Sequence, residues 1–156
     1  MRHPHKVKKL VAMAANLNPS LEAIYPETEV MAKEMVTGMP EEAKSTPNGK
    51  RFLKVTGLLL SEPHIDPKSL AKITAPTLIV SSDHDVIRLE HTVTIFNNLP
   101  NANLAVLPNN THMVPFDDPE LFNATVQRFL DTPFVKKDRI KDMMASGEKM
   151  AAATPH

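Results

Sequence analysis

APTLIVSSDHDVI, residues 75–87, is the stretch of sequence that decides the fold. It begins with TLIV, an apolar and β-branched run of the kind found in strands that are buried on both faces of a sheet. A polar loop follows and contains Asp83, His84 and Asp85. The stretch therefore predicts a parallel strand that places acidic side chains at its carboxyl end.

A second stretch of the same kind lies at residues 103–115. The apolar run LAVL predicts a strand over residues 103–107, and the turn residues PNN then place His112 on a loop. Residues 88–98 predict a helix between the two strands. His112 lies 27 positions after Asp85, which leaves room for a parallel crossover of at least about a dozen residues. Two parallel strands would thus present an acid and an imidazole at one edge of the sheet.

These motifs resemble those of the second half of α/β-hydrolases, in which the catalytic acid follows a strand in a pattern like PTLIVxGDxD and the catalytic histidine follows the next strand in a pattern like PxxxHxxP. The resemblance implies catalytic roles for Asp85 and His112. It continues into residues 115–130, which match the last helix of the family, and into residues 2–16. Asp83 is expected to bond to loop backbone N–H groups. Ser82 stands where the family usually has glycine.

The predicted fold class is α/β, a partial α/β-hydrolase fold with about three parallel strands flanked by helices. Residues 1–135 form this partial domain, with a proline-rich insertion at about residues 17–66 that contains predicted helices at 27–37 and 47–60. The resemblance implies that the insertion is a small cap, whose apolar residues either line a substrate pocket or pack on the sheet. Residues 136–156 form a weakly helical or frayed tail. Three pairs of a capping residue and a proline mark helix starts: Thr46-Pro47, Asp66-Pro67 and Asp118-Pro119.

The family's nucleophile elbow, G-x-S-x-G, does not occur in the sequence. In the family's chain order the nucleophile would precede Arg2, so we expect a carboxyl half that begins just after the nucleophile and is inactive alone. The strand predicted at residues 9–16 would then have an unpaired apolar edge. Such an edge favours self-association into a homo-oligomer or pairing with a complementing amino-terminal half.

Three functional hypotheses follow, ranked in this order. The first is a hydrolase of ester, amide or similar bonds that acts on a small-molecule substrate once complemented. The second is a non-catalytic fragment that associates through its sheet edge. The third is a metal-binding module built from Asp83, His84, Asp85 and His112; we rank it last and expect no metal and no cofactor. His91, on the helix predicted at 88–98, is assigned no chemistry.

Composition argues against several other partners. Eighteen basic and eighteen acidic residues cancel, which disfavours binding to nucleic acid or to an anionic membrane. The absence of cysteine excludes disulfides and thiolate metal sites. No apolar run approaches the roughly 20 residues of a membrane span. We therefore expect a cytoplasmic protein.

Overall fold

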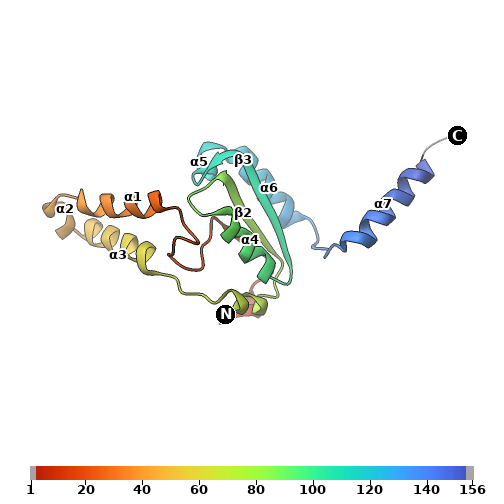
Figure 1. Cartoon of the computed structure of the whole chain (residues 1–156), viewed down its shortest axis with the longest axis horizontal. Helices are drawn as coiled ribbons and strands as arrows, with labels where there is room; N and C mark the ends of the chain where they lie inside the picture. Colours follow the sequence, from red (N-terminus) through yellow and green to blue (C-terminus); the bar gives the residue numbers. More distant parts are fainter. Residues whose placement is uncertain (1–2, 154–156) are drawn as a thin grey trace.

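A three-stranded parallel sheet forms the centre of the computed structural model, which describes residues 3–153 (Figure 1). The strand order is β1 (Leu10–Met13), β2 (Thr77–His84) and β3 (Ala102–Thr111). Leu10 lies opposite Thr77, and Thr77 lies opposite Ala102. The predicted partial α/β fold with three parallel strands is confirmed.

The central strand, β2, is buried because helices cover both faces of the sheet (Figure 1). Successive side chains of a strand point to opposite faces, so β2 contributes to two separate apolar clusters. The cluster on the side of α4 (Leu89–Asn98) and of the 3-10 helix η2 (Pro67–Lys72) contains Leu17, Leu70, Ile79, Ile95 and Leu99. The cluster on the side of α6 (Pro119–Asp131) contains Leu78, Val80, Leu107, Val114 and Phe129.

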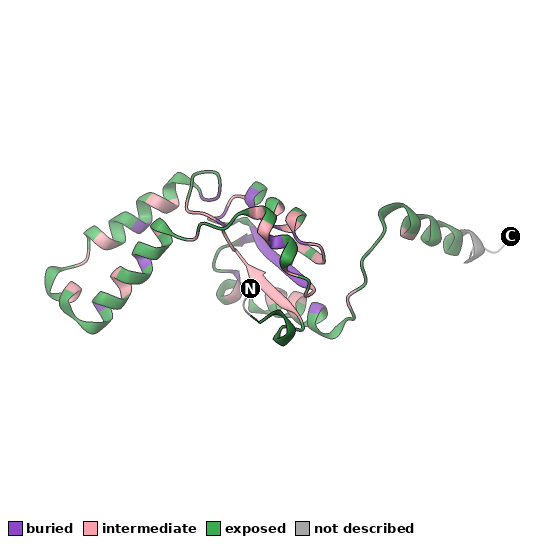
Figure 2. Cartoon of the chain, turned by 90° about the horizontal axis from the view of Figure 1, so that it is seen from below, coloured by how far each residue is buried: buried purple, intermediate pink, exposed green. Residues whose placement is uncertain are grey.

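The first strand is shorter than predicted. We expected a strand over residues 9–16, but β1 ends at Met13 because Ala14 has a left-handed backbone conformation, with φ of 46°. Within residues 3–153, β1 pairs only with β2 and lies at an edge of the sheet, where its side chains are half-buried (Figure 2).

The third strand is longer than predicted. Its expected end was Leu107, yet β3 continues through the predicted turn to Thr111. Pro108 is tolerated there because β3 is also an edge strand of the sheet, and an edge strand does not need every N–H for pairing. The pairing with β2 is irregular between Ser82 and His84, where β3 has extra residues.

The insertion forms α1 (Pro26–Thr37), the unpredicted short α2 (Glu41–Ser45) and α3 (Pro47–Ser61), which project from the sheet as a helical hairpin (Figure 1). The predicted helix start at Thr46 is confirmed, since its hydroxyl accepts the N–H of Gly49 at 3.0 Å. The other two predicted starts are confirmed as well. Asp66 accepts the N–H of Lys68 at 3.0 Å, and Asp118 accepts that of Leu121 at 3.2 Å.

Leu17 holds the two ends of the insertion to the body of the protein. Its N–H donates to Nε2 of His91 at 2.9 Å, and its carbonyl accepts the N–H of Ile65 at 2.8 Å. His91 is buried, and burial lowers its pKa despite the opposing charge of Glu22. The neutral ring can accept this hydrogen bond whereas a protonated ring cannot, so His91 has a structural role.

The carboxyl-terminal segment adds two helices and a tail. α5 (Val114–Asp117), which we did not predict, begins two residues after His112 and leads into α6. The predicted weak helix is α7 (Arg139–Ala153), which stands away from the body and continues through Gly147 (Figure 1). Its apolar side chains Ile140, Met143, Met144 and Met150 are exposed. No helix in residues 3–153 has the length and apolar character needed to cross a membrane.

Lys9 joins the beginning of the sheet to the end of α6. Its ammonium donates to the carbonyls of Phe129, Leu130 and Thr132 at 2.8, 2.7 and 2.7 Å, and it lies 5.2 Å from the centre of the Phe129 ring. The last carbonyls of a helix have no partners within the helix, and a cation there also complements the helix dipole. Lys9 thus caps α6 from a residue about 120 positions away.

We predict that Lys9→Met lowers the free energy of unfolding by about 1–3 kcal/mol, because methionine keeps the apolar stem and loses all three charged hydrogen bonds. Urea unfolding followed by circular dichroism measures this change. The exposed neighbour Lys8 provides the control, since Lys8→Met should change the unfolding free energy by less than about 0.5 kcal/mol. Equal effects of the two substitutions would contradict the capping role.

Candidate active site

The structure brings Asp85 and His112 together where β2 and β3 end. Oδ1 of Asp85 lies 2.9 Å from Nδ1 of His112. Asp85 directly follows β2 and His112 directly follows β3, so parallel pairing of these strands places both residues at the same edge of the sheet. The juxtaposition expected from the sequence is therefore present.

The carboxylate of Asp85 is buried and surrounded by donors. Its side chain has no solvent exposure, and it accepts the N–H of Ile87 at 3.2 Å and, more weakly, the Ser81 hydroxyl at 3.4 Å and the Ser82 N–H at 3.5 Å. Burial alone would raise the pKa of Asp85, but the hydrogen bonds from His112 and from the backbone outweigh burial and lower it. Asp85 is therefore a carboxylate at neutral pH.

The ring of His112 is held at one nitrogen and open at the other. A carboxylate can only accept a hydrogen bond, so Nδ1 of His112 is the donor in this contact. In the neutral ring this leaves the lone pair on Nε2, for which residues 3–153 provide no hydrogen-bond partner. The side chain is 44% exposed. The hydrogen bond to Asp85 raises the pKa of His112, although burial opposes the increase. An oriented imidazole with an accessible Nε2 can act as a general base.

Asp83, two residues before Asp85, bonds to backbone N–H groups as expected, but it does so from within β2, because this strand continues to His84 where the sequence predicted a loop. Its two carboxylate oxygens accept the N–H groups of Asn109 and Asn110 at 2.8 and 3.1 Å. These amides lower the pKa of Asp83. Asp83 and Asp85 thus have separate partners. The part of the chain that the structure describes contains no group of three or more His, Cys, Asp or Glu side chains that could hold a metal ion, so the set of Asp83, His84, Asp85 and His112 does not converge on one.

The insertion is anchored immediately after Asp85. Ile24 forms an isolated antiparallel bridge with Ile87, and the N–H of Arg88 donates to Ala23 at 2.8 Å. The Arg88 guanidinium lies 4.4 Å from the centre of the Tyr25 ring, and its Nε donates to Leu21 at 2.7 Å. We did not predict these contacts, because no local sequence pattern connects residues 21–25 with residues 86–88.

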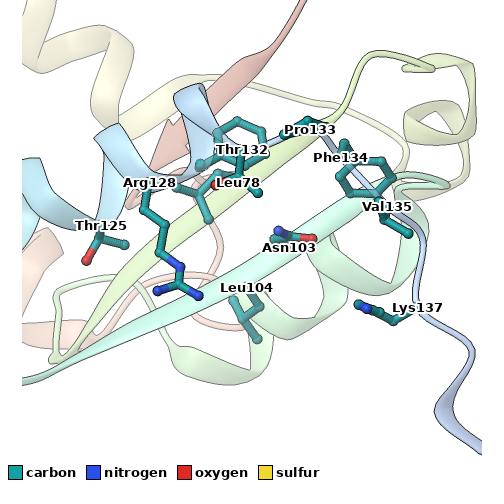
Figure 3. Close-up of a pocket in the computed structure, with 11 residues that line it drawn as sticks. Leu78, Asn103, Leu104, Thr125, Arg128, Thr132, Pro133, Phe134, Val135 and Lys137 are labelled. Carbon is teal, nitrogen blue, oxygen red and sulfur yellow. The ribbon is translucent and has the colours of Figure 1, made fainter. Parts of the chain in front are cut away.

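An apolar hollow beside α6 is a different feature. This cavity, of about 460 Å³, lies between the first residues of β2 and β3, the end of α6 and residues 132–137 (Figure 3). Leu78 and Phe129 form part of its wall, and Arg128 and Lys137 flank it. Its lining includes neither Asp85 nor His112, which lie at the opposite ends of the strands. We therefore do not assign this cavity to the Asp85–His112 pair.

Comparison with solved structures identifies the fold. The chain is similar to MGS-M2, an α/β-hydrolase enzyme from a Medee basin deep-sea metagenome library, with a TM-score of 0.61 and 20% identity over 88% of this chain and 61% of that one. The chain has a partial α/β-hydrolase fold.

Two further solved structures have a similar relationship to the chain. The putative non-heme bromoperoxidase BpoC of Mycobacterium tuberculosis H37Rv gives a TM-score of 0.60 at 17% identity, with 83% of this chain and 59% of that one covered. The carboxylesterase CesB (YbfK) of Bacillus subtilis gives 0.56 at 20% identity, with 83% and 53% covered. This chain thus spans 53–61% of the length of these three proteins. No protein-family model and no curated protein matches its sequence.

We predict that Asp85→Asn lowers the pKa of His112, because the hydrogen bond to the carboxylate is the main cause of the raised value. Titration of the His112 ring by NMR measures the change. An unchanged His112 titration in Asp85→Asn would contradict this explanation.

The pair of Asp85 and protonated His112 stabilises the native state below about pH 6.5, and this contribution is lost as pH rises through the raised pKa of His112.

Proposed function

We propose that this chain supplies the catalytic aspartate, Asp85, and the catalytic histidine, His112, of an α/β-hydrolase active site. This site cleaves an ester or similar bond of a small molecule. The observation that carries the proposal is the 2.9 Å contact between the buried Asp85 and the half-exposed His112. The fold supports it, because the pair lies beyond the carboxyl ends of parallel strands, where open α/β sheets place their ligands.

In the proposed reaction, Nε2 of His112 takes the proton of a nucleophilic hydroxyl as its oxygen attacks the substrate carbonyl. The imidazolium then gives this proton to the leaving group. Asp85 keeps Nδ1 protonated and stabilises the positive ring in between. A water molecule, deprotonated in the same way, releases the acyl group from the nucleophile. The raised pKa of His112 favours the imidazolium that both halves of the reaction require.

The proposed nucleophile and oxyanion hole come from residues outside this sequence, on the same or another polypeptide, since the sequence has no G-x-S-x-G. The edge of β1 offers a place for a strand that carries them. The N–H of Leu10 donates to the carbonyl of Pro76, just before β2, and the N–H of Ala14 donates to that of Val80 in β2, each at 2.9 Å. Because backbone groups alternate along a strand, the N–H and C=O groups of Val11 and Met13 face away from β2 and are available for pairing.

The insertion is our candidate for a cap over the substrate, because its anchor at Ile87 follows Asp85 by two residues. Its helices have exposed apolar side chains, among them Met31 and Leu59, and Phe116, four residues after His112, is 77% exposed. These surfaces favour a substrate with an apolar acyl or alcohol group. We place the activity in the cytoplasm, as predicted from the sequence.

The direct test is hydrolysis of p-nitrophenyl butyrate by the purified chain, alone and after co-expression with an amino-terminal α/β-hydrolase segment that has a G-x-S-x-G elbow. We predict no activity for the chain alone and activity for the complex. His112→Ala should lower the activity of the complex by about 10³-fold or more, because the nucleophile loses its base.

His84→Ala is the matched control, because it removes a nearby imidazole that makes no hydrogen bond or ion pair with the side chain of Asp85 or His112, and it should leave the activity of the complex unchanged. Activity of the chain alone that disappears in His112→Ala would locate the nucleophile within these 156 residues and contradict the proposed division. Equal activity of the complex with and without His112→Ala would overturn the catalytic role of His112.

The alternative function is a non-catalytic chain that associates with a second copy through β1. The backbone N–H and C=O groups of Val11 and Met13, which face away from β2, favour this alternative. For this alternative we predict a dimer that Val11→Pro converts into a monomer, because proline removes an N–H from the free edge and leaves the pairing with β2 intact. Light scattering after gel filtration measures the mass. Val11→Thr keeps the N–H and the branched shape and should remain dimeric, and a monomeric wild-type chain would rule out this function.

A further inference from the structure

The segment that leads into His112 is held in an irregular pairing with β2. Ser82 lies opposite Leu107 and His84 lies opposite Thr111. Asp83 alone therefore faces residues 108–110, and β3 has two residues more than β2 over this short distance. Asn109 takes a left-handed conformation here, with φ of 53°.

Two neighbouring side chains of β2 hold these extra residues. The carboxylate of Asp83 accepts the N–H groups of Asn109 and Asn110 at 2.8 and 3.1 Å. The hydroxyl of Ser82 donates to the carbonyl of Thr111 at 2.8 Å. Together these bonds fix three successive residues, and His112 is the next one. The Asp83 bonds are charge-assisted and therefore among the stronger hydrogen bonds.

The position of His112 depends on how the extra residues are accommodated. Side chains along a strand alternate between faces, so a change of one residue in the pairing would turn the following side chain to the opposite face. A left-handed conformation is uncommon for residues other than glycine, although asparagine adopts it more readily than most, and hydrogen bonds to Asp83 hold Asn109 in it. The carboxylate of Asp83 accepts the N–H of Asn109 and also the N–H of Asn110.

We propose that Asp83, assisted by Ser82, is a positioning residue that fixes the extra residues of β3 and thereby holds His112 against Asp85. This inference rests on the proposed function of the Asp85–His112 pair. Asp83 does not touch His112, and its influence goes through the backbone of residues 109–111 rather than through its charge. Ser82, which stands where glycine is usual in the resembling motif, gains a role as the second contact.

The experiment is an NMR titration of His112 in the whole chain with Asp83→Ala. Without its two anchors the segment 109–111 loosens, contact between His112 and Asp85 becomes less populated, and the raised pKa of His112 falls toward 6.5. Asp66→Ala is the matched control. Asp66 is also an exposed aspartate that accepts a backbone N–H, but it does so at the start of η2, and its loss should leave the titration of His112 unchanged.

An unchanged titration of His112 in a folded Asp83→Ala variant would overturn the inference. If circular dichroism shows that this variant does not fold, the titration of His112 in Ser82→Ala tests the inference instead. That substitution removes only the hydroxyl that donates to Thr111, and it should lower the pKa of His112 in the same direction and by less. No change there would equally overturn the proposal.

Activity of the complemented enzyme separates this inference from the proposed function. If the function holds, Asp83→Ala should lower kcat by about 10²-fold with little change in KM, because it displaces the base and leaves the substrate contacts in place. A titration that shifts as expected in a complex without hydrolytic activity would refute the function and leave the positioning role standing. Activity that needs His112 but tolerates Asp83→Ala, with no shift in the titration, would refute the positioning role alone.

Discussion

The pairing of β2 with β3 is the constraint on which the site depends. β2 is buried on both faces, so its direction and register are fixed by two apolar clusters. The pairing carries that register across to β3 and determines where each strand ends. Asp85 and His112 belong to the residues just beyond these ends, and their contact follows from the sheet rather than from any attraction strong enough to form it alone.

The two residues of the pair have different surroundings, and the difference suits the roles proposed for them. Asp85 has no exposed side-chain surface and is surrounded by hydrogen-bond donors, which keep it charged in a place that would otherwise favour the neutral acid. His112 remains accessible on the side opposite Asp85. A buried, fixed carboxylate next to an exposed imidazole gives the ring an orientation without restricting what it can reach.

Much of the fold can be predicted from the sequence. The correct predictions rest on local signals, which act between residues that are neighbours in the chain. The apolar run of β2, the capping residues Thr46, Asp66 and Asp118 and the polar residues after the two strands act through neighbours in the chain. Two features that were not predicted involve distant contacts: beyond Pro108, β3 donates the N–H of Asn109 to Asp83, and the insertion is anchored where Ile24 meets Ile87. The early end of β1 is local, since Ala14 takes a left-handed conformation that no sequence pattern indicates.

The contacts of Leu17 with His91 and Ile65 have a consequence for how much this fold can vary. The hydrogen bond between Leu17 and Ile65 brings the two ends of the insertion together, so the insertion is a closed loop. The entropic cost of such a loop grows only with the logarithm of its length. Each doubling of such a loop costs about 0.6 kcal/mol. Helices beyond this point can therefore be lengthened, shortened or exchanged at little thermodynamic cost, while the strands that hold Asp85 and His112 keep their pairing. The surface that the insertion presents and the geometry of the Asp85–His112 pair can then change independently in a protein of this architecture.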